Sequence, residues 1–185
     1  MKDQEVKFEP LKYFRTSGCI APSSSFLVKK MLEKIDFESV EVIVEFGAGD
    51  GCFTREILKK LKPSGKLLSF EVNAEFCHVI QKTIKDDRFI LIPKSAEEMT
   101  HELSRLGIEK VDCVVSSLPL VFIPLPSINN ILLQVKNILA KKGVLLQFQY
   151  SLANNANIKR YFNKVIKTIE LRNLPPAIIY RCINT

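Results

Sequence analysis

The sequence predicts an α/β fold in which a seven-stranded, mostly parallel β-sheet carries helices on both faces. Short apolar runs alternate with segments whose apolar residues recur at helical spacing, which is typical of consecutive β-α-β units. Residues 42–58 place an apolar strand, a glycine-rich turn and a helix start in succession, the first half of such a unit. Near the end of the chain two strands follow one another with no helix between them, so we expect one antiparallel edge strand.

The elements begin and end at residues that favour such boundaries. Serines after Pro22 can cap the first helix, and Pro63 and Gly65 end the helix that follows the glycine turn. Lys141 to Gly143 form the turn before the fifth strand. The expected strands are residues 42–45, 66–72, 89–92, 111–116, 144–150, 165–171 and 177–182. The expected helices are residues 24–35, a segment ending near 61, and residues 74–84, 127–139 and 154–162.

The glycine turn is the strongest functional signal in the chain. Gly47, Gly49 and Gly51 alternate with other residues, which differs from the Gly-x-Gly-x-x-Gly spacing of dinucleotide-binding folds. No Gly-Lys-Ser/Thr follows to hold a triphosphate. Glu45 precedes the turn and Asp50 lies within it, where a carboxylate would repel a pyrophosphate. The turn therefore suits a cationic ligand that carries an amino group and a sulfonium.

Polar residues at the ends of the next strands extend this predicted site. Glu71 ends the second strand 20 residues after Gly51, where an acid in a nucleotide-binding unit accepts hydrogen bonds from ribose hydroxyls. Ser95 to Glu97 follow the third strand and can meet an adenine or cap the next helix, two compatible roles. Ser116 ends the fourth strand. Ligands in open α/β sheets bind beyond the carboxyl ends of the strands, so these residues are expected to converge.

The segment VEFGAGDG, residues 44–51, closely resembles the S-adenosylmethionine (SAM) motif of Rossmann-like class I methyltransferases. This resemblance implies SAM as cofactor, S-adenosylhomocysteine as product and no metal. It implies that Glu45 and the three glycines hold the methionine part of SAM, that Glu71 holds the ribose, and that Ser95 to Glu97 flank the adenine. The complete set implied is Glu45, Gly47, Ala48, Gly49, Gly51, Glu71, Val72, Ser95, Ala96, Glu97 and Ser116.

Three further blocks resemble bacterial phospholipid N-methyltransferases and the related small proteins grouped with ribosomal RNA adenine dimethyltransferases. They are GCIAPSSSFLVKKM at residues 18–31, DCVVSSLPLVFIP at 112–124 and RNLPPAIIYR at 172–181. The resemblance implies methylation of the amine of phosphatidylethanolamine-type lipids at the membrane surface. Methyl transfer is an in-line displacement, so an enzyme mainly positions and desolvates the nucleophile. Ser116, Ser117, Leu118 and Pro119 are expected to face the reacting amine.

The same block favours a lipid over RNA. Adenine dimethyltransferases resemble one another in an Asn-Leu-Pro-Tyr type motif whose aromatic ring stacks on a flipped-out base. Here Ser117 replaces the asparagine and Leu120 replaces the aromatic residue. The apolar residues 120–123 suit acyl chains or glycerol better than a purine. An RNA adenine N6-methyltransferase, a small-molecule amine methyltransferase and a SAM-binding protein without turnover remain as alternatives.

Composition and charge set wider bounds. A chain of 185 residues predicts a single domain, with residues 1–40 as an N-terminal lid segment, residues 41–185 as the core, and a monomer. Residues 141–185 carry eight Lys or Arg against one acid and so hold the whole formal excess of +7, which favours an anionic membrane surface or nucleic acid. Residues 1–16 mix aromatic and basic side chains, as an interfacial segment does.

Cellular location is also predicted from the sequence. Five scattered cysteines without Cys-x-x-Cys spacing favour reduced thiols rather than disulfides or a zinc site. The first ten residues contain no apolar stretch of the kind found in secretory signals. The longest apolar stretch, residues 111–128, contains Asp112 and three prolines and is a poor membrane-spanning helix. We therefore expect a cytoplasmic protein, peripheral on the inner face of the cell membrane.

Overall fold

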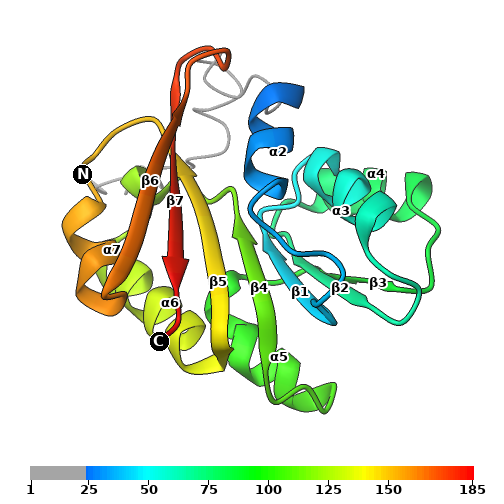
Figure 1. Cartoon of the computed structure of the whole chain (residues 1–185). Coiled ribbons are helices and arrows are strands. Elements are labelled where there is room, and N and C mark those ends of the chain that lie inside the picture. The colour runs from blue at the N-terminus through cyan, green and yellow to red at the C-terminus, as the bar shows by residue number, and fades with distance from the viewer. Residues whose placement is uncertain (1–23) are drawn as a thin grey trace, which may run out of the picture.

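The computed structural model describes residues 24–185 (Figure 1). Predictions that fall on residues 1–23 lie outside the described residues. These are the interfacial segment at 1–16, most of the N-terminal lid and the beginning of the block at 18–31. Within the part that the structure describes, no helix is long and apolar enough to cross a membrane.

The helices and strands alternate in the predicted order. The helices are α2 (Ser25–Leu32), α3 (Cys52–Lys60), α4 (Ala74–Thr83), α5 (Met99–Arg105), α6 (Leu125–Ile138) and α7 (Asn155–Tyr161), with short 3-10 turns η1 (Ala96–Glu98) and η2 (Leu120–Phe122). The strands are β1 (Val42–Phe46), β2 (Lys66–Phe70), β3 (Phe89–Ile92), β4 (Val111–Ser116), β5 (Leu139–Gln149), β6 (Lys164–Glu170) and β7 (Ala177–Ile183).

The seven strands form one sheet in the order β3-β2-β1-β4-β5-β7-β6. The five strands from β3 to β5 pair in parallel, so their carboxyl ends share one edge of the sheet. β7 pairs antiparallel with both β5 and β6. The predicted single antiparallel strand is confirmed, and the structure places it one position inside the edge, with β6 outermost. The long β6–β7 hairpin rises above the rest of the sheet in Figure 1.

Alternate residues of each strand feed two hydrophobic cores, one on each face of the sheet. Ile43 of β1 packs beneath α2, α3 and α4, and its neighbour Val44 packs against the opposite layer of α5, α6 and α7. Figure 1 shows these two helix layers on either side of the sheet. Successive side chains of a strand point to opposite faces, so apolar runs such as β1 are the expected sequence of a strand buried on both sides. The predicted layering on both faces is confirmed.

Several boundaries differ from prediction, and three of the differences have a clear local reason. β5 begins at Leu139 rather than at 144, because the expected Lys141–Gly143 turn lies within the strand as an irregularity in its pairing with β4. β2 ends at Phe70, where its pairing with both neighbours stops, so Glu71 lies just past the strand. α6 begins at Leu125, two residues early, since a proline is tolerated in the first turn of a helix.

Candidate functional site

The predicted site residues converge at the carboxyl edge of the parallel strands. Phe46 is level with Phe70 of β2 and with Ser116 of β4. Backbone hydrogen bonds continue beyond the strands and connect the loops. The amide of Gly47 donates to the carbonyl of Phe70 at 2.9 Å, and that of Ser117 donates to the carbonyl of Phe46 at 3.0 Å. The loops after β1, β2 and β4 are therefore held side by side at this edge.

The glycine turn has the backbone conformation that its spacing predicts. Gly47, Gly49 and Gly51 have φ angles of +74°, +55° and +83°, in the left-handed region that disfavours side chains. A Cβ atom added to Gly49 would meet no heavy atom within 4 Å, so the middle of the turn faces open space. Gly51 is the N-cap of α3, which therefore begins with no side-chain cap. The turn leaves bare backbone beside the open end of a helix, where a ligand can approach closely.

Glu45 is the most unusual residue of the site because its carboxylate is buried at 1% exposure. One oxygen, Oε2, accepts hydrogen bonds from Thr54 Oγ1 of α3 at 2.7 Å and from Ser69 Oγ of β2. The other oxygen, Oε1, is buried and has no hydrogen-bond partner among the described residues. A buried carboxylate oxygen without a donor is costly, so Oε1 is an acceptor that a bound ligand could satisfy.

The electrostatics of the turn favour a cation. The pKa of Glu45 is raised to about 7, mainly by burial and in part by the nearby charges of Glu71 and Asp50, against the lowering effect of the hydrogen bonds from Ser69 and Thr54. Burial, followed by the charges of Asp50 and Glu45, also raises the pKa of the Cys52 thiol to about 12. Three carboxylates around one turn create a negative potential that a positive ligand would relieve. The donorless Oε1 and this potential fit the ammonium and sulfonium of SAM.

Glu71 stands on the other side of the turn. Its Oε2 accepts the amide hydrogen of Gly49 at 2.8 Å, and its Oε1 accepts that of Asn73 at 2.8 Å. Each carboxylate oxygen has a second lone pair and can accept a further hydrogen bond from a hydroxyl. Glu71 thus connects β2 to the glycine turn and retains acceptor capacity. Its neighbour Val72 is exposed.

The loop after β3 has the capping geometry that its sequence suggests. Ser95 Oγ accepts the amide hydrogen of Glu97 at 3.2 Å, so Ser95 caps the short turn η1. Ala96 is buried in the core beneath, and Glu97 is exposed. The capping role of Ser95 is therefore observed, and a contact with adenine stays a prediction.

The loop after β4 is tied to the glycine turn by Ser117. Its Oγ lies 2.5 Å from the carbonyl oxygen of Gly47 and 3.0 Å from that of Phe46, and donates its hydrogen to these backbone acceptors. Ser116 Oγ is buried and accepts the amide hydrogen of Leu118 at 3.4 Å. Both hydroxyls therefore form hydrogen bonds with backbone groups. These bonds hold the loop from Ser116 to Pro119 in place, and they use the serine hydroxyls that were expected to face the amine.

Two buried glutamines fix the same loop from β5. Gln147 and Gln149 both donate through Nε2 to the carbonyl oxygen of Leu118, at 3.1 Å and 2.9 Å. These two residues are not among those that the sequence predicts for the site. Their signal was present, because two polar residues at a spacing of two lie on the same face of an otherwise apolar strand. Thr54 and Ser69, the partners of Glu45, were also missed, and single small polar residues in apolar elements give no comparable pattern.

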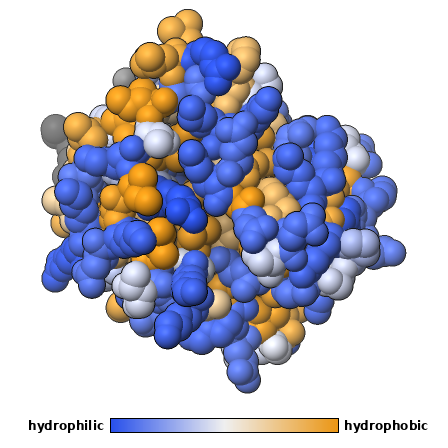
Figure 2. Space-filling model, in the orientation of Figure 1, coloured by the Kyte–Doolittle hydropathy of each residue, from blue (hydrophilic) through white to orange (hydrophobic). Residues whose placement is uncertain are grey.

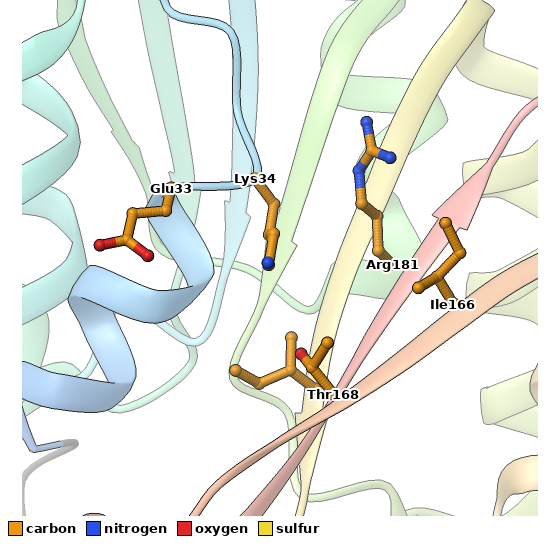
Figure 3. Close-up of a pocket in the computed structure, with 6 residues that line it drawn as sticks. Glu33, Lys34, Ile166, Thr168 and Arg181 are labelled. Carbon is orange, nitrogen blue, oxygen red and sulfur yellow. The ribbon is translucent and has the colours of Figure 1, made fainter.

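A cavity of about 340 Å³ lies elsewhere, between the end of α2 and the β6–β7 pair. Figure 3 shows Lys34, just after α2, on the side of Thr168 and Arg181 of the strand pair, while the carboxylate of Glu33 points away from them. None of the residues predicted to hold the cofactor lines this cavity. In residues 24–185 no group of three or more His, Cys, Asp or Glu side chains is placed to hold a metal ion.

No protein family model matches this chain. The chain is 30% identical over 176 residues to an ornithine lipid N-methyltransferase from Singulisphaera acidiphila, and the match covers 92% of each protein. It is 33% identical over 89 residues to a ribosomal RNA small subunit methyltransferase H from Christiangramia forsetii, a match to 48% of this chain and 28% of that protein.

The solved structures agree on the fold. An O-methyltransferase from Bacillus cereus in complex with SAH superposes with a TM-score of 0.71 at 11% identity, covering 95% of this chain and 88% of that one. The strand order, the glycine turn and the nearly full-length match to the S. acidiphila protein point to one conclusion. The chain is a class I methyltransferase that uses S-adenosylmethionine, and it belongs to the same family as that N-methyltransferase.

Proposed function

We propose that this methyltransferase transfers methyl groups to the primary amine of a lipid head group at a membrane surface, with phosphatidylethanolamine-type lipids as substrates. The observation that carries the proposal is the match over 92% of both chains to a protein named for N-methylation of ornithine lipid. Both lipids present an amine on a head group attached to acyl chains. The two lipids differ in the rest of the head group, and the experiment below distinguishes between them.

The cofactor is proposed to bind across the ends of β1 to β4. Glu45 would receive the ammonium group at its donorless Oε1, and the glycine turn would admit the methionine chain to bare backbone. Glu71 would accept hydrogen bonds from the ribose hydroxyls while it holds Gly49. Val72 and residues 95–97 would flank the adenine. Ala48 and Ser116, both buried, would support the turn from below.

The bound cofactor supplies an electrophilic methyl group on a sulfonium. The protein's part is to orient the amine lone pair along the line of that bond and to exclude water. The segment from Ser116 to Pro119 would shape the acceptor side, with the Leu118 carbonyl fixed by Gln147 and Gln149. Transfer turns the amine into a methylated ammonium, which must lose a proton before another round.

The position of Leu120 supports a lipid over an RNA base. Leu120 occupies the place of the stacking aromatic residue of adenine dimethyltransferases, and it is 2% exposed, packed in the core with Ile128. A side chain buried there offers no face for a base to stack on. The next residues, Val121 and Phe122, are exposed apolar side chains that suit acyl chains.

The test is to incubate the purified protein with methyl-labelled SAM and to offer three acceptors in parallel. These are phosphatidylethanolamine vesicles, ornithine lipid vesicles and undermethylated small-subunit ribosomal RNA. Label in the phosphatidylethanolamine fraction is the expected result. Label in ornithine lipid alone would retain the lipid class and replace the head group. Label in RNA alone, or in none of the three while SAM binds, would overturn the proposal.

A further inference from the structure

Three aromatic side chains follow one another from the start of α3 to the end of β5, and we call them the aromatic row. Phe53 is the second residue of α3, directly after the glycine turn. Its ring stacks on that of Phe148, with the centroids 6.2 Å apart and the planes at 18°. The rings of Phe148 and Tyr150 meet edge-on at 5.7 Å. Phe53 and Phe148 are buried, whereas Tyr150 is 43% exposed, so the row begins beside the glycine turn and ends in a ring that solvent reaches.

Tyr150 is also connected to the loop after β4. The strands β4 and β5 are parallel, with Ser116 level with Gln147, so Tyr150 lies three residues further along, past the carboxyl end of β5. Its neighbour Gln149 donates to the Leu118 carbonyl at 2.9 Å. Tyr150 is thus joined to the glycine turn by the aromatic row and to the expected acceptor loop by Gln149. These two connections place its ring at the border of the candidate site.

The hydroxyl end of Tyr150 is held by the tip of the β6–β7 hairpin. Asn173 is buried at this tip, and its Nδ2 donates to Tyr150 Oη at 3.5 Å. The same amide nitrogen donates to the Pro175 carbonyl at 2.7 Å, and Asn173 Oδ1 accepts the amide hydrogen of Ser24 at 3.3 Å. Because Phe148 contacts one end of the tyrosine ring and an anchored amide contacts the other, the exposed part of the ring is held in one orientation.

An exposed aromatic ring in this position suits a cation. The negative face of an aromatic ring attracts positive charge, and aromatic side chains recognise quaternary ammonium ligands in this way. Next to Asn173 on the hairpin tip, the guanidinium of Arg172 already lies 4.5 Å from the centre of the Phe26 ring. Within residues 24–185 no cation lies over the ring of Tyr150, so its exposed surface is open to a ligand.

The surroundings of the ring favour a cation that holds its water weakly. Leu171 and Leu174 at the hairpin tip are 75% and 86% exposed, and Figure 2 shows hydrophobic side chains at the top of the molecule, around this tip. A primary ammonium donates several hydrogen bonds to water, whereas each added methyl group removes one donor and covers the charge with apolar atoms. A methylated ammonium therefore loses less when it leaves water for these surroundings.

We propose that the ring of Tyr150 is the cation-binding face of the acceptor site and holds the methylated ammonium group of the substrate. This inference rests on the proposed methylation of an amine, and it adds the residue that distinguishes a methylated ammonium from an uncharged group of the same shape. A ring face requires no N–H donor, so the contact persists on a nitrogen that carries no hydrogen.

The test compares two soluble ligands of nearly the same shape. Choline carries a trimethylammonium group, and dimethylbutanol is its uncharged analogue, in which carbon replaces the nitrogen. Each ligand is titrated into the full chain saturated with S-adenosylhomocysteine, and binding is followed by NMR of the ligand's methyl protons. Wild type should bind choline more tightly by about 2- to 30-fold, the usual range for a cation–π contact. Tyr150→Leu should lose this preference, and Tyr150→Phe should keep it.

Tyr161→Leu is the matched control, because Tyr161 of α7 packs on the opposite face of the sheet from the aromatic row. This variant should prefer choline as wild type does. Affinity for S-adenosylhomocysteine, measured for each variant, verifies that the fold is intact. The proposal is overturned if wild type binds neither ligand or both equally, or if Tyr150→Leu still prefers choline. An equal fall of both affinities in Tyr150→Leu also overturns it, because the side chain then contributes packing without attraction for charge.

This measurement does not depend on turnover or on the lipid substrate. Choline has no acyl chain and no hydrogen on its nitrogen, so its binding is measured without reaction. If no label enters lipid but Tyr150→Leu loses the preference for choline, the proposed substrate fails and the ammonium site stands. If label enters lipid but Tyr150→Leu keeps the preference, the proposed substrate stands and the role of Tyr150 fails.

Discussion

The side-chain oxygen of Ser117 lies 2.7 Å from the position that a Cβ atom on Gly47 would occupy. Gly47 also has a φ of +74°, so two constraints act on one residue. Gly47, the first glycine of the turn, therefore packs closely against the loop after β4. A substitution at either residue tests how closely the two loops must approach.

Gly47→Ala should lower the free energy of unfolding by about 2–5 kcal/mol, the sum of about 1–2 for a left-handed side chain and about 1–3 for overpacking. Gly107→Ala is the matched control, because Gly107 has a φ of +68° and open space around it. The free energy of unfolding of Gly107→Ala should fall only by the about 1–2 kcal/mol expected for a left-handed side chain. Chemical denaturation measures both values, and Gly47→Ala/Ser117→Ala should recover part of the loss. Equal losses in the two glycine variants would show that the approach of Ser117 is unimportant.

The buried Glu45 should make the stability of the SAM-free protein depend on pH. Its pKa is about 7 in the folded chain against an ordinary 4.5, so its stabilising contribution is complete below pH 4.5 and is lost as pH rises through 7. The shift corresponds to on the order of 3 kcal/mol. Glu45→Gln cannot titrate, so its unfolding free energy should lack this decline. Chemical denaturation of wild type and Glu45→Gln between pH 5 and 8 measures this pH dependence. Glu109→Gln, a change at an exposed glutamate, is the control. Parallel curves for wild type and Glu45→Gln would refute the assignment.

Glu71→Ala should weaken SAM binding by about 10- to 100-fold, which is the usual effect of losing hydrogen bonds to a charged acceptor. Calorimetry with SAM and with a 2′-deoxyribose analogue separates two causes. If Glu71 contacts the ribose, the variant should discriminate less between the two ligands than wild type does. If Glu71 only holds Gly49, affinity for both falls equally. The exposed Glu38→Ala serves as the control for loss of one acidic charge.

The two glutamines on β5 should act redundantly. Each donates to the Leu118 carbonyl, so Gln147→Leu or Gln149→Leu alone leaves one hydrogen bond in place. The double variant should reduce kcat/KM for the amine acceptor by more than the product of the single effects, with little change in SAM affinity. Steady-state kinetics measures this coupling. Additive losses, or an equal loss of SAM affinity, would exclude a role confined to the acceptor side.

Neutralising the four basic residues on α7 and β6 should weaken binding to anionic vesicles, most strongly at low ionic strength where screening is least. The change is Lys159, Arg160, Lys164 and Lys167 to Gln. An equal number of lysines on α3 and α4 or beside them, Lys59, Lys60, Lys82 and Lys85, provides a control with the same loss of net charge. Co-sedimentation over a salt series measures both. Equal losses would mean that total charge matters and its position does not.

Much of the fold was predictable because each strand is a short apolar run with a clear end. β3 and β4 have the predicted bounds, and the convergence of Glu45, Glu71 and Ser116 follows from parallel strands ending at one edge. β5 was predicted too short because Lys141 to Gly143 look like a turn in isolation. This stretch is held by backbone hydrogen bonds of Lys142 and Gly143 with Asn184, just after β7, and β5 pairs with β4 on either side of it. Such long-range contacts are not visible locally.

The interior of the site was less predictable. That Glu45 would be buried follows from its place after an apolar run, but its donors Thr54 and Ser69 come from two other elements. Ser117 was expected to face the substrate, yet its hydroxyl is used by the backbone of the glycine turn. Sequence spacing indicates which loops meet. It does not indicate which of the polar atoms in those loops bond to each other.

The raised pKa of Glu45 has a consequence for how the cofactor binds. Near pH 7 a large share of SAM-free molecules carry a proton on this carboxyl. An ammonium group placed at Oε1 would favour the ionised form, so binding would expel that proton into solution. The observed heat of binding would then vary with the ionisation enthalpy of the buffer, and affinity would rise with pH until the carboxyl is fully ionised. Cofactor capture in this enzyme would thus be an exchange of one positive charge for another.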